Sequence, residues 1–211
     1  ALLSLGGRPM LDHVVERVLV LKPTINEVCL ATSESERDAP LESIAIKNKI
    51  AFFRGSEWDV VGRMRDAARM LSADVIIRVT GDCPLFAPDV AFAVLNGFLI
   101  GGRDYVSNDT TVSGYPDGTD VEVFTRTALE LAADKASRPT DREHVTTWIR
   151  EHRRCGLVAN GIDYSAMKLS VDRPADLELV QAMYRILRPG AFFLEDTVAA
   201  YEAVQSEREN R

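Results

Sequence analysis

Predicted helices alternate with short apolar segments over the first hundred residues, and this order limits the possible folds more than any other feature of the chain. Each predicted helix has apolar residues at helical spacing, and each predicted strand is a short β-forming run. The helices are expected at residues 8–21, 40–49, 60–71 and 88–98, and the strands at residues 27–31, 50–54 and 75–80. Such alternation with short connections is typical of an α/β fold, in which helices cover both faces of a mainly parallel sheet.

The pattern is less regular after residue 101, where turn residues separate shorter segments. We expect strands at residues 104–108, 121–124, 155–160 and 167–171, and helices at residues 126–136, 140–151, 174–187 and 194–204. No linker or change of composition divides the 211 residues, so they are expected to form one domain, residues 1–211. Within it, residues 114–160 resemble an insertion that could form the interface of a homodimer.

The overall charge and the cysteines limit the partners and the compartment. The formal net charge of −7 argues against a general binder of nucleic acids or of anionic membranes. No apolar run approaches the ~20 residues that a membrane-spanning helix needs. The cysteines Cys29, Cys83 and Cys155 lie far apart, without the pair spacing of a zinc site or a disulfide framework. These features predict a cytoplasmic protein without nucleic-acid or membrane partners.

An aspartate follows a predicted strand in two places. In the segment IIRVTGDCPLFAPD, Asp82 follows the strand at residues 75–80, and Gly81 would let a ligand approach the backbone closely. In the segment LSVDRPADLELV, Asp172 occupies the same kind of position before a helix. Ligands of open α/β sheets bind outside the carboxyl ends of the strands, and Mg²⁺ binds one or two carboxylates together with substrate phosphates. Each aspartate could instead cap a turn or a helix, but the pair together favours a site for a nucleotide phosphate and a metal ion.

These two segments, together with DYVSN, YPDGTDVEVF and DREHVT, come in an order that resembles the cytidylyltransferases that activate acidic sugars. The similarity is to the spore coat polysaccharide proteins related to CMP-KDO synthetase, whose relatives include acylneuraminate cytidylyltransferases. The resemblance implies a Rossmann-like nucleotide-diphospho-sugar transferase fold. It also implies a Mg²⁺-dependent reaction that joins CTP and an acidic or modified sugar into a CMP-sugar and pyrophosphate, for the synthesis of surface polysaccharides or glycans.

The resemblance assigns roles to individual residues by their positions in the motifs. It implies that Asp82 and Asp172 are the catalytic, metal-binding aspartates. It also implies nucleotide contacts from the segments LATS, VTGD and FRGSEWDVVGR, namely from Ala31, Thr32, Ser33, Thr80, Gly81 and Arg63. Without the resemblance, Arg63 would be interpreted as a solvated charge on a helix.

The stretch between the two aspartates is where the resembled family binds its sugar. Asp120 and Glu122 are two residues apart on a predicted strand, so they share one face and could bind sugar hydroxyls or face solvent. Arg142 and His144 could meet a substrate carboxylate, with the guanidinium making a bidentate contact. Alternatively, Arg142 is an exposed charge in the first turn of a helix and His144 packs against its neighbours.

The beginning of the chain departs from the family pattern. Family members open with a strand and a loop rich in glycine and arginine that holds the triphosphate, and ALLSLGGRPML resembles the sequence that follows this loop. We therefore expect the first strand and the loop to precede residue 1. Two other functions are compatible with the sequence: a non-catalytic homologue that binds nucleotide-sugars, and a glycosyltransferase of related fold. The second would need an Asp-x-Asp metal motif, to which the sequence offers only poor matches.

Overall fold

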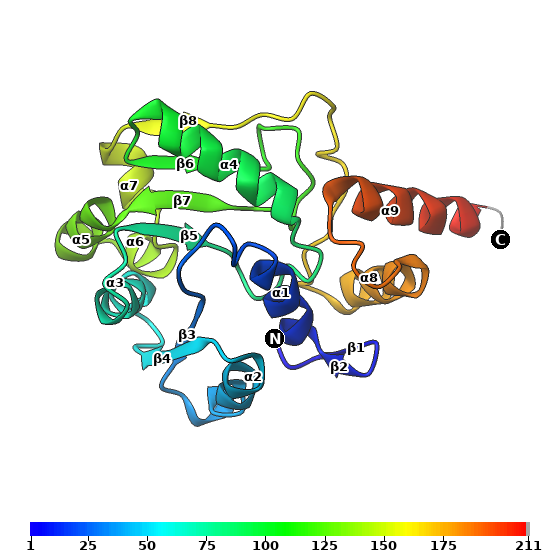
Figure 1. Cartoon of the computed structure of the whole chain (residues 1–211), viewed down its shortest axis with the longest axis horizontal. Helices are drawn as coiled ribbons and strands as arrows, with labels where there is room; N and C mark the ends of the chain where they lie inside the picture. The colour runs from blue at the N-terminus through cyan, green and yellow to red at the C-terminus, as the bar shows by residue number, and fades with distance from the viewer. Residues whose placement is uncertain (210–211) are drawn as a thin grey trace.

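A four-stranded mixed sheet forms the centre of the larger part of the molecule (Figure 1). In the computed structural model, which describes residues 1–209, its strands are β5 (Val75–Arg78), β6 (Tyr105–Ser107), β7 (Glu122–Thr125) and β8 (Cys155–Leu157). They lie in the order β5-β7-β6-β8, and β7 is antiparallel to both of its neighbours. Because β8 is parallel to β6, the strands β5, β6 and β8 point in one direction. The α/β fold class predicted from the alternating pattern is confirmed, while residues 210–211 of the predicted domain lie outside the described part.

Two parallel strands, β3 (Cys29–Ser33) and β4 (Ala51–Gly55), form a separate small sheet. The connection between them contains a 3₁₀ turn (Glu36–Asp38) and the helix α2 (Leu41–Asn48). Parallel neighbours need such a crossover, because the chain must return to the starting edge before the second strand begins. The predicted strands at residues 27–31 and 50–54 are both present, shifted by one or two residues.

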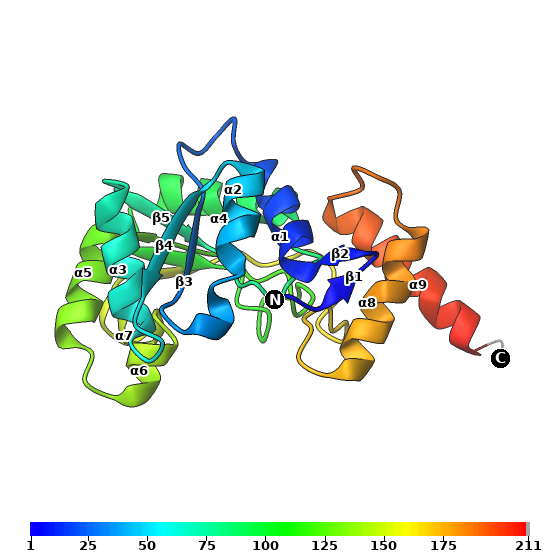
Figure 2. The same ribbon diagram turned by 90° about the horizontal axis from the view of Figure 1, so that it is seen from below.

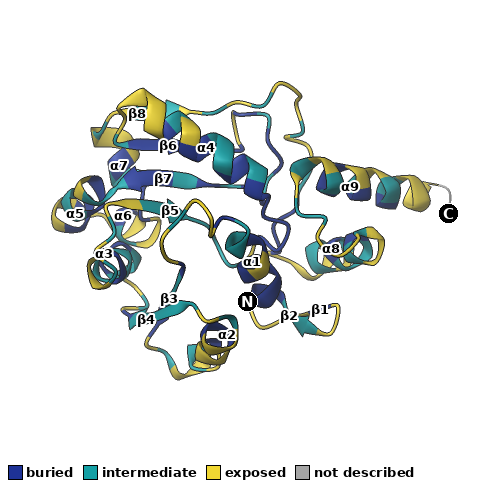
Figure 3. Ribbon diagram, viewed as in Figure 1, coloured by how far each residue is buried: buried dark blue, intermediate teal, exposed yellow. Residues whose placement is uncertain are grey.

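Successive residues of the central strands face two different helix layers. In β7, Val123 packs against α4 (Pro88–Gly101), while the next residue, Phe124, packs against α3 (Val60–Met70) and α5 (Arg126–Lys135). Both faces of the sheet are therefore buried, as the apolar strand sequences predicted. Figures 1 and 2 show these layers, and Figure 3 shows the exposed residues on the outer sides of the helices.

Two helices near the C-terminus, α8 (Pro174–Ile186) and α9 (Leu194–Glu209), pack against each other at one end of the molecule (Figure 2). They share a core cluster with the hairpin formed by β1 (Ser4–Leu5) and β2 (Arg8–Pro9) and with the first residue of α1 (Met10–Leu19). The predicted helix at 8–21 thus begins two residues later than expected. No helix within residues 1–209 is long and apolar enough to cross a bilayer.

The buried arginine of α1 connects this end of the molecule to the loop after Asp82. Arg17 is 1% exposed, and its guanidinium donates to the carbonyl oxygen of Phe86 at 3.0 Å. The hydroxyl of Tyr184, on α8, donates to the carbonyl oxygen of Pro84 at 2.7 Å. Two helices therefore hold the backbone of residues 84–86, which fixes the exit from the turn that carries Asp82.

The single helix predicted at residues 140–151 is wrong, because the structure has two short helices there. They are α6 (Pro139–Glu143) and α7 (Thr147–His152), separated at Val145, which has a φ of 58°. This left-handed conformation is costly for a β-branched residue. Val145 is fully buried in the core cluster beneath α5, so packing of its side chain offsets the backbone strain.

Candidate active site

A cavity of about 320 Å³ opens where β5 and β6 end and β7 begins. The carboxyl ends of β5 and β6 meet here because these strands point in the same direction, and β7 contributes its amino end because it is reversed. Of the residues predicted from the sequence, Thr80, Asp82, Asp120, Glu122 and Asp172 line the cavity. Its position matches the general rule that ligands of open α/β sheets bind outside the strand ends.

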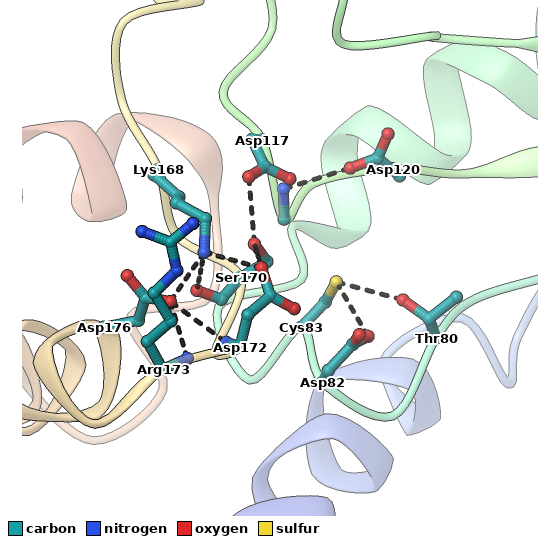
Figure 4. A network of polar contacts seen from close by, with 11 residues as sticks. Thr80, Asp82, Cys83, Asp117, Asp120, Lys168, Ser170, Asp172, Arg173 and Asp176 are labelled. Carbon is teal, nitrogen blue, oxygen red and sulfur yellow. Dashed lines mark hydrogen bonds and ion pairs between the residues drawn. The ribbon is translucent and has the colours of Figure 1, made fainter.

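Asp82 stands at the rim of the cavity with its carboxylate exposed (Figure 4). The thiol of Cys83 makes a long contact of 3.5 Å to Asp82 Oδ1 and lies 3.1 Å from the Thr80 hydroxyl. Burial raises the pKa of the Cys83 thiol well above its usual range, with the nearby Asp82 charge acting in the same direction, so the thiol stays neutral. Within the described chain, no cation pairs with the Asp82 carboxylate, which leaves it available to a ligand.

A backbone hydrogen bond brings Asp172 beside Asp82. The Val171 amide donates to the Asp82 carbonyl oxygen at 2.9 Å, so the residue before Asp172 is joined directly to the turn after β5. The Asp172 carboxylate accepts from Lys168 Nζ at 2.6 Å, and the same ammonium group donates to Asp176 at 2.6 Å (Figure 4). The two predicted aspartates therefore lie on adjacent segments of one cavity, which local sequence alone did not establish.

The strand predicted at residues 167–171 is wrong: the segment is extended but pairs with a loop. It forms an isolated parallel bridge in which the Asp117 amide donates to Met167 at 3.1 Å and the Leu169 amide donates back to Asp117 at 2.7 Å. The Ser170 hydroxyl adds a hydrogen bond of 2.9 Å to the Asp117 carboxylate (Figure 4). The Asp117–Gly118 turn therefore determines where the segment before Asp172 runs.

Asp120 follows this turn and is held by neutral donors. The Gly118 amide donates to one of its oxygens at 3.0 Å and the Thr110 hydroxyl to the other at 2.9 Å. Burial raises the pKa of Asp120, the Asp117 charge adds to this effect, and the two hydrogen bonds oppose it. Asp120 is thus a recessed acceptor beside the cavity.

Two arginines that the sequence did not single out also line the cavity. Arg78 pairs with Glu122, which also accepts a hydrogen bond of 2.8 Å from the Tyr105 hydroxyl. Arg150 pairs with Asp109. Arg78 is the charged residue in the apolar run VIIRVT, a signal that could have identified it, whereas Arg150 is one of many charged helix residues.

The predicted nucleotide-contact residues Ala31, Thr32, Ser33 and Arg63 do not line this cavity. The hydroxyl of Thr32 donates to Asp38 at 3.4 Å, and Ser33 donates to the same carboxylate. Thr32 and Ser33 lie at the carboxyl end of β3. Gly81 is also absent from the cavity lining, although it belongs to the turn beside Asp82.

Arg63 is a cation that forms no ion pair with a carboxylate of the described residues. Its guanidinium donates to the carbonyl oxygen of Ser56 at 2.7 Å, and its buried Nε has no hydrogen-bond partner within residues 1–209. Burial lowers the pKa of Arg63, but an arginine remains charged at neutral pH. Arg63 is partly buried, and a guanidinium group without a carboxylate partner among residues 1–209 is suited to an anionic ligand.

Arg142 and His144 lie outside the lining of the cavity. The Arg142 guanidinium pairs with Asp59 and donates to the carbonyl oxygen of Ala133, which ties α6 to the start of α3 and the end of α5. His144 is exposed at the end of α6. The structure thus gives Arg142 a clear role in packing, and its predicted contact with a substrate carboxylate stays a prediction.

We expect the substitution Arg142→Ala to lower the free energy of unfolding by about 1 kcal/mol, because a partly exposed ion pair and a carbonyl contact are lost. Arg126→Ala is a suitable control, since Arg126 pairs with an Asp74 side chain that is 84% exposed. Chemical denaturation measures the stability, and calorimetric titration measures the affinity for substrates. A loss of sugar affinity at unchanged stability would instead favour the predicted substrate contact.

The carboxylate oxygens of the cavity provide only part of the ligand set that Mg²⁺ needs. No group of three or more histidine, cysteine or acidic side chains within residues 1–209 is arranged to hold a metal ion. Mg²⁺ does not need such a cage, because it commonly binds one or two carboxylates together with waters and substrate phosphates. Asp82 offers a free carboxylate, and Asp172 would share its carboxylate with Lys168. The pair is therefore compatible with a metal ion that arrives with a phosphate ligand.

A family model described as cytidylyltransferase matches residues 1–184. An uncharacterised protein from Methanocaldococcus jannaschii is 35% identical over 151 residues, which are 72% of this chain and 60% of that protein. The chain thus spans less than two thirds of this archaeal relative. The spore coat polysaccharide biosynthesis protein SpsF from Bacillus subtilis is 30% identical over 190 residues, 86% of this chain and 78% of SpsF.

Among solved structures, a cytidylyltransferase from Leptospira borgpetersenii is similar over nearly the whole chain. The two are 28% identical, with a TM-score of 0.86, and the match covers 99% of this chain and 87% of the other.

Proposed function

Because the chain belongs to the cytidylyltransferase family, we propose that it transfers CMP from CTP to a sugar, with release of pyrophosphate, for the synthesis of a polysaccharide or glycan. The single observation that carries the proposal is the hydrogen bond of 2.9 Å between Val171 and Asp82. It joins the segments of Asp82 and Asp172 at the strand ends, where a nucleotide phosphate and an acceptor can meet. The SpsF relative, named for polysaccharide biosynthesis, supports the choice of a sugar as acceptor.

The phosphate side of the reaction depends on charge. Asp82 and Asp172 would hold Mg²⁺, which when bound neutralises phosphate oxygens. Arg63, a cation without an ion-pair partner among the described residues, would bind a phosphate of CTP. A Cβ atom at Gly81 would lie 3.3 Å from Leu11 Cδ1, so the glycine lets this turn pack closely against α1, and its contact with the nucleotide remains part of this proposal. The contacts of Ala31, Thr32 and Ser33 with ribose or base remain part of this proposal.

The acceptor side depends on orientation. A sugar hydroxyl forms a new bond to the α-phosphorus and gives up its proton to solvent, while the bond from this phosphorus to the oxygen of the leaving pyrophosphate breaks. Asp120 and Glu122 lie in the cavity wall and would accept hydrogen bonds from other hydroxyls of the sugar. Such contacts hold the attacking oxygen in line with the leaving group, which is the main contribution a protein makes to phosphoryl transfer.

The test is release of pyrophosphate from CTP and Mg²⁺ in the presence of a panel of sugars. Formation of a CMP-sugar, identified by mass spectrometry, is expected. Binding of CTP without turnover of any sugar would favour the non-catalytic alternative, and transfer of sugar from a nucleotide-sugar to an acceptor would favour the glycosyltransferase. The cytoplasmic location and a homodimer interface within residues 114–160 remain predictions.

We expect CTP with Mg²⁺ to raise the melting temperature more than ATP, GTP or UTP does. A ligand present at 100 times its dissociation constant adds about 2.7 kcal/mol of stability, which corresponds to roughly 5–10 °C for a chain of this size. Differential scanning fluorimetry measures the shifts at equal nucleotide concentrations. Equal shifts for the four nucleotides would contradict specificity for cytidine, and the same series without Mg²⁺ shows how much of the shift depends on the metal.

A further inference from the structure

Lys168 bridges two carboxylates at the edge of the proposed metal site. Its ammonium group donates to Asp172 Oδ2 and to Asp176 Oδ2 at 2.6 Å each (Figure 4). The Lys168 side chain is 40% exposed and the Asp172 side chain 55%, so a ligand can reach both groups from solvent. A cation of the protein therefore occupies one oxygen of a carboxylate that the proposed function assigns to Mg²⁺.

The second partner of Lys168, Asp176, is fixed in the first turn of α8. Its carboxylate accepts from the Asp172 amide at 3.1 Å and from the Arg173 amide at 2.9 Å, and its side chain is 17% exposed. Asp176 would hold the ammonium group if the contact with Asp172 were broken. Lys168 can therefore release Asp172 without becoming an unpaired cation, and an exposed ion pair costs little to break.

The Asp172 carboxylate also has an oxygen for a metal ion. Its Oδ2 accepts from Lys168 and, at 3.4 Å, from the Ser170 hydroxyl, whereas Oδ1 accepts no hydrogen bond from residues 1–209. A divalent cation on Oδ1 would share the carboxylate with the ammonium group, and the two cations would repel each other over a short distance. The phosphates of a nucleotide reverse this balance, because they bring negative charge to both cations and further ligands to the metal ion.

We propose that Lys168 is a positioning residue that makes metal binding depend on the nucleotide. Without CTP, its ammonium group occupies Asp172 and weakens the binding of a metal ion by Asp82 and Asp172. When the phosphates of CTP are present, Lys168 releases Asp172 to the metal ion and stays with Asp176. The inference rests on the proposed function, in which these two aspartates hold Mg²⁺, and adds that metal and nucleotide enter the site together.

The substitution Lys168→Met tests this role, because methionine has a similar length and lacks the charge. Calorimetry measures the affinity of the full chain for Mn²⁺ alone, used in place of Mg²⁺. We expect this affinity to rise about fivefold, equivalent to about 1 kcal/mol, since the competing cation is removed. A lysine that only stabilised the loop at residues 168–176 would give no such rise, and its loss would lower the melting temperature.

The second measurement is the affinity for the preformed complex of Mn²⁺ and CTP. Lys168→Met should bind this complex no more tightly than the wild type, because the variant has also lost a positive charge beside the phosphates. The gain in affinity that the nucleotide gives to the metal should thus fall by about fivefold or more. Lys168→Arg retains the charge and should restore the wild-type values for both ligands.

Two further variants guard the interpretation. Lys22→Met is the control, because Lys22 pairs with Glu27 at 3.6 Å outside the cavity lining, and both affinities should stay at the wild-type values. Lys168→Gln replaces Lys168→Met if the methionine variant is unstable, since its amide can still donate to Asp176 while the charge is absent. The same rise in affinity for Mn²⁺ alone is expected for it.

The outcomes distinguish this inference from the proposed function. An unchanged or lower affinity for Mn²⁺ alone in the folded uncharged variants would overturn the inference and leave the transfer of CMP standing. An equal rise for Mn²⁺ alone and for its complex with CTP would also overturn it, because Lys168 would then not couple the two ligands. If the wild type binds the complex but releases no pyrophosphate with any sugar, the proposed function fails, while the two affinities still decide the role of Lys168.

Discussion

The substitution Asp82→Asn is expected to lower turnover by about a thousandfold while the fold stays intact. The reason is that the change removes a carboxylate that has no cation partner in the described structure and stands beside the proposed phosphate site. Loss of metal-based charge neutralisation costs several kcal/mol of transition-state stabilisation, and about 4 kcal/mol corresponds to this factor. Stability should hardly change, since within residues 1–209 the carboxylate accepts only the long thiol contact from Cys83. The experiment measures pyrophosphate release and the melting temperature. Calorimetry measures the binding of Mn²⁺, which is used here in place of Mg²⁺.

Asp74→Asn is a matched control for this substitution. Asp74 directly precedes β5, whereas Asp82 follows it, so the two changes remove the same charge from opposite ends of one strand. The Asp74 side chain is 84% exposed and pairs with Arg126, far from any proposed chemistry. Turnover should therefore remain at the wild-type level. Wild-type turnover and Mn²⁺ affinity in Asp82→Asn would remove Asp82 from the proposed metal site.

The parts of the site that could be predicted are those with a local signal. The apolar run at residues 75–80 ends in Gly81 and Asp82, and the strand, the turn and the exposed carboxylate are all present. Asp120 and Glu122 were identified from the alternation of a strand and both line the cavity. In each case the chemistry of a few neighbouring residues determines the local structure.

The parts that could not be predicted depend on how distant segments pair. Arg78 and Glu122 are 44 residues apart in sequence and lie opposite each other because β7 is antiparallel to β5. Arg150 reaches Asp109 across 41 residues. Arg142, for which the sequence left a substrate contact and an exposed helix charge both open, pairs with Asp59 across 83 residues. The choice of partner decides whether an arginine is free to bind a ligand, and a single sequence contains no signal for it.

The substitution Gly118→Ala is expected to lower the free energy of unfolding by about 3 kcal/mol, because the new methyl group would collide with the backbone that runs to Asp172. Gly118 has a φ of 95°, and a Cβ atom there would lie 2.6 Å from the carbonyl carbon of Leu169 and closer still to the Ser170 nitrogen. The bridge between Asp117 and the segment at residues 167–171 would have to open. The melting temperature should fall by roughly 6–12 °C.

The variant Gly102→Ala separates two causes of the loss of stability in Gly118→Ala, namely backbone strain and the collision of the new methyl group. Gly102 has a φ of 54°, but a Cβ atom there would meet nothing within 4 Å, so its substitution introduces backbone strain without a collision. It should cost about 1 kcal/mol, and turnover below the melting temperature should be unchanged. Gly118→Ala should also lower turnover under conditions where it remains folded, since the displaced segment carries Asp172. Equal losses of stability in the two variants, with turnover unaffected in both, would mean that the close approach at Gly118 does not hold the two halves of the site together.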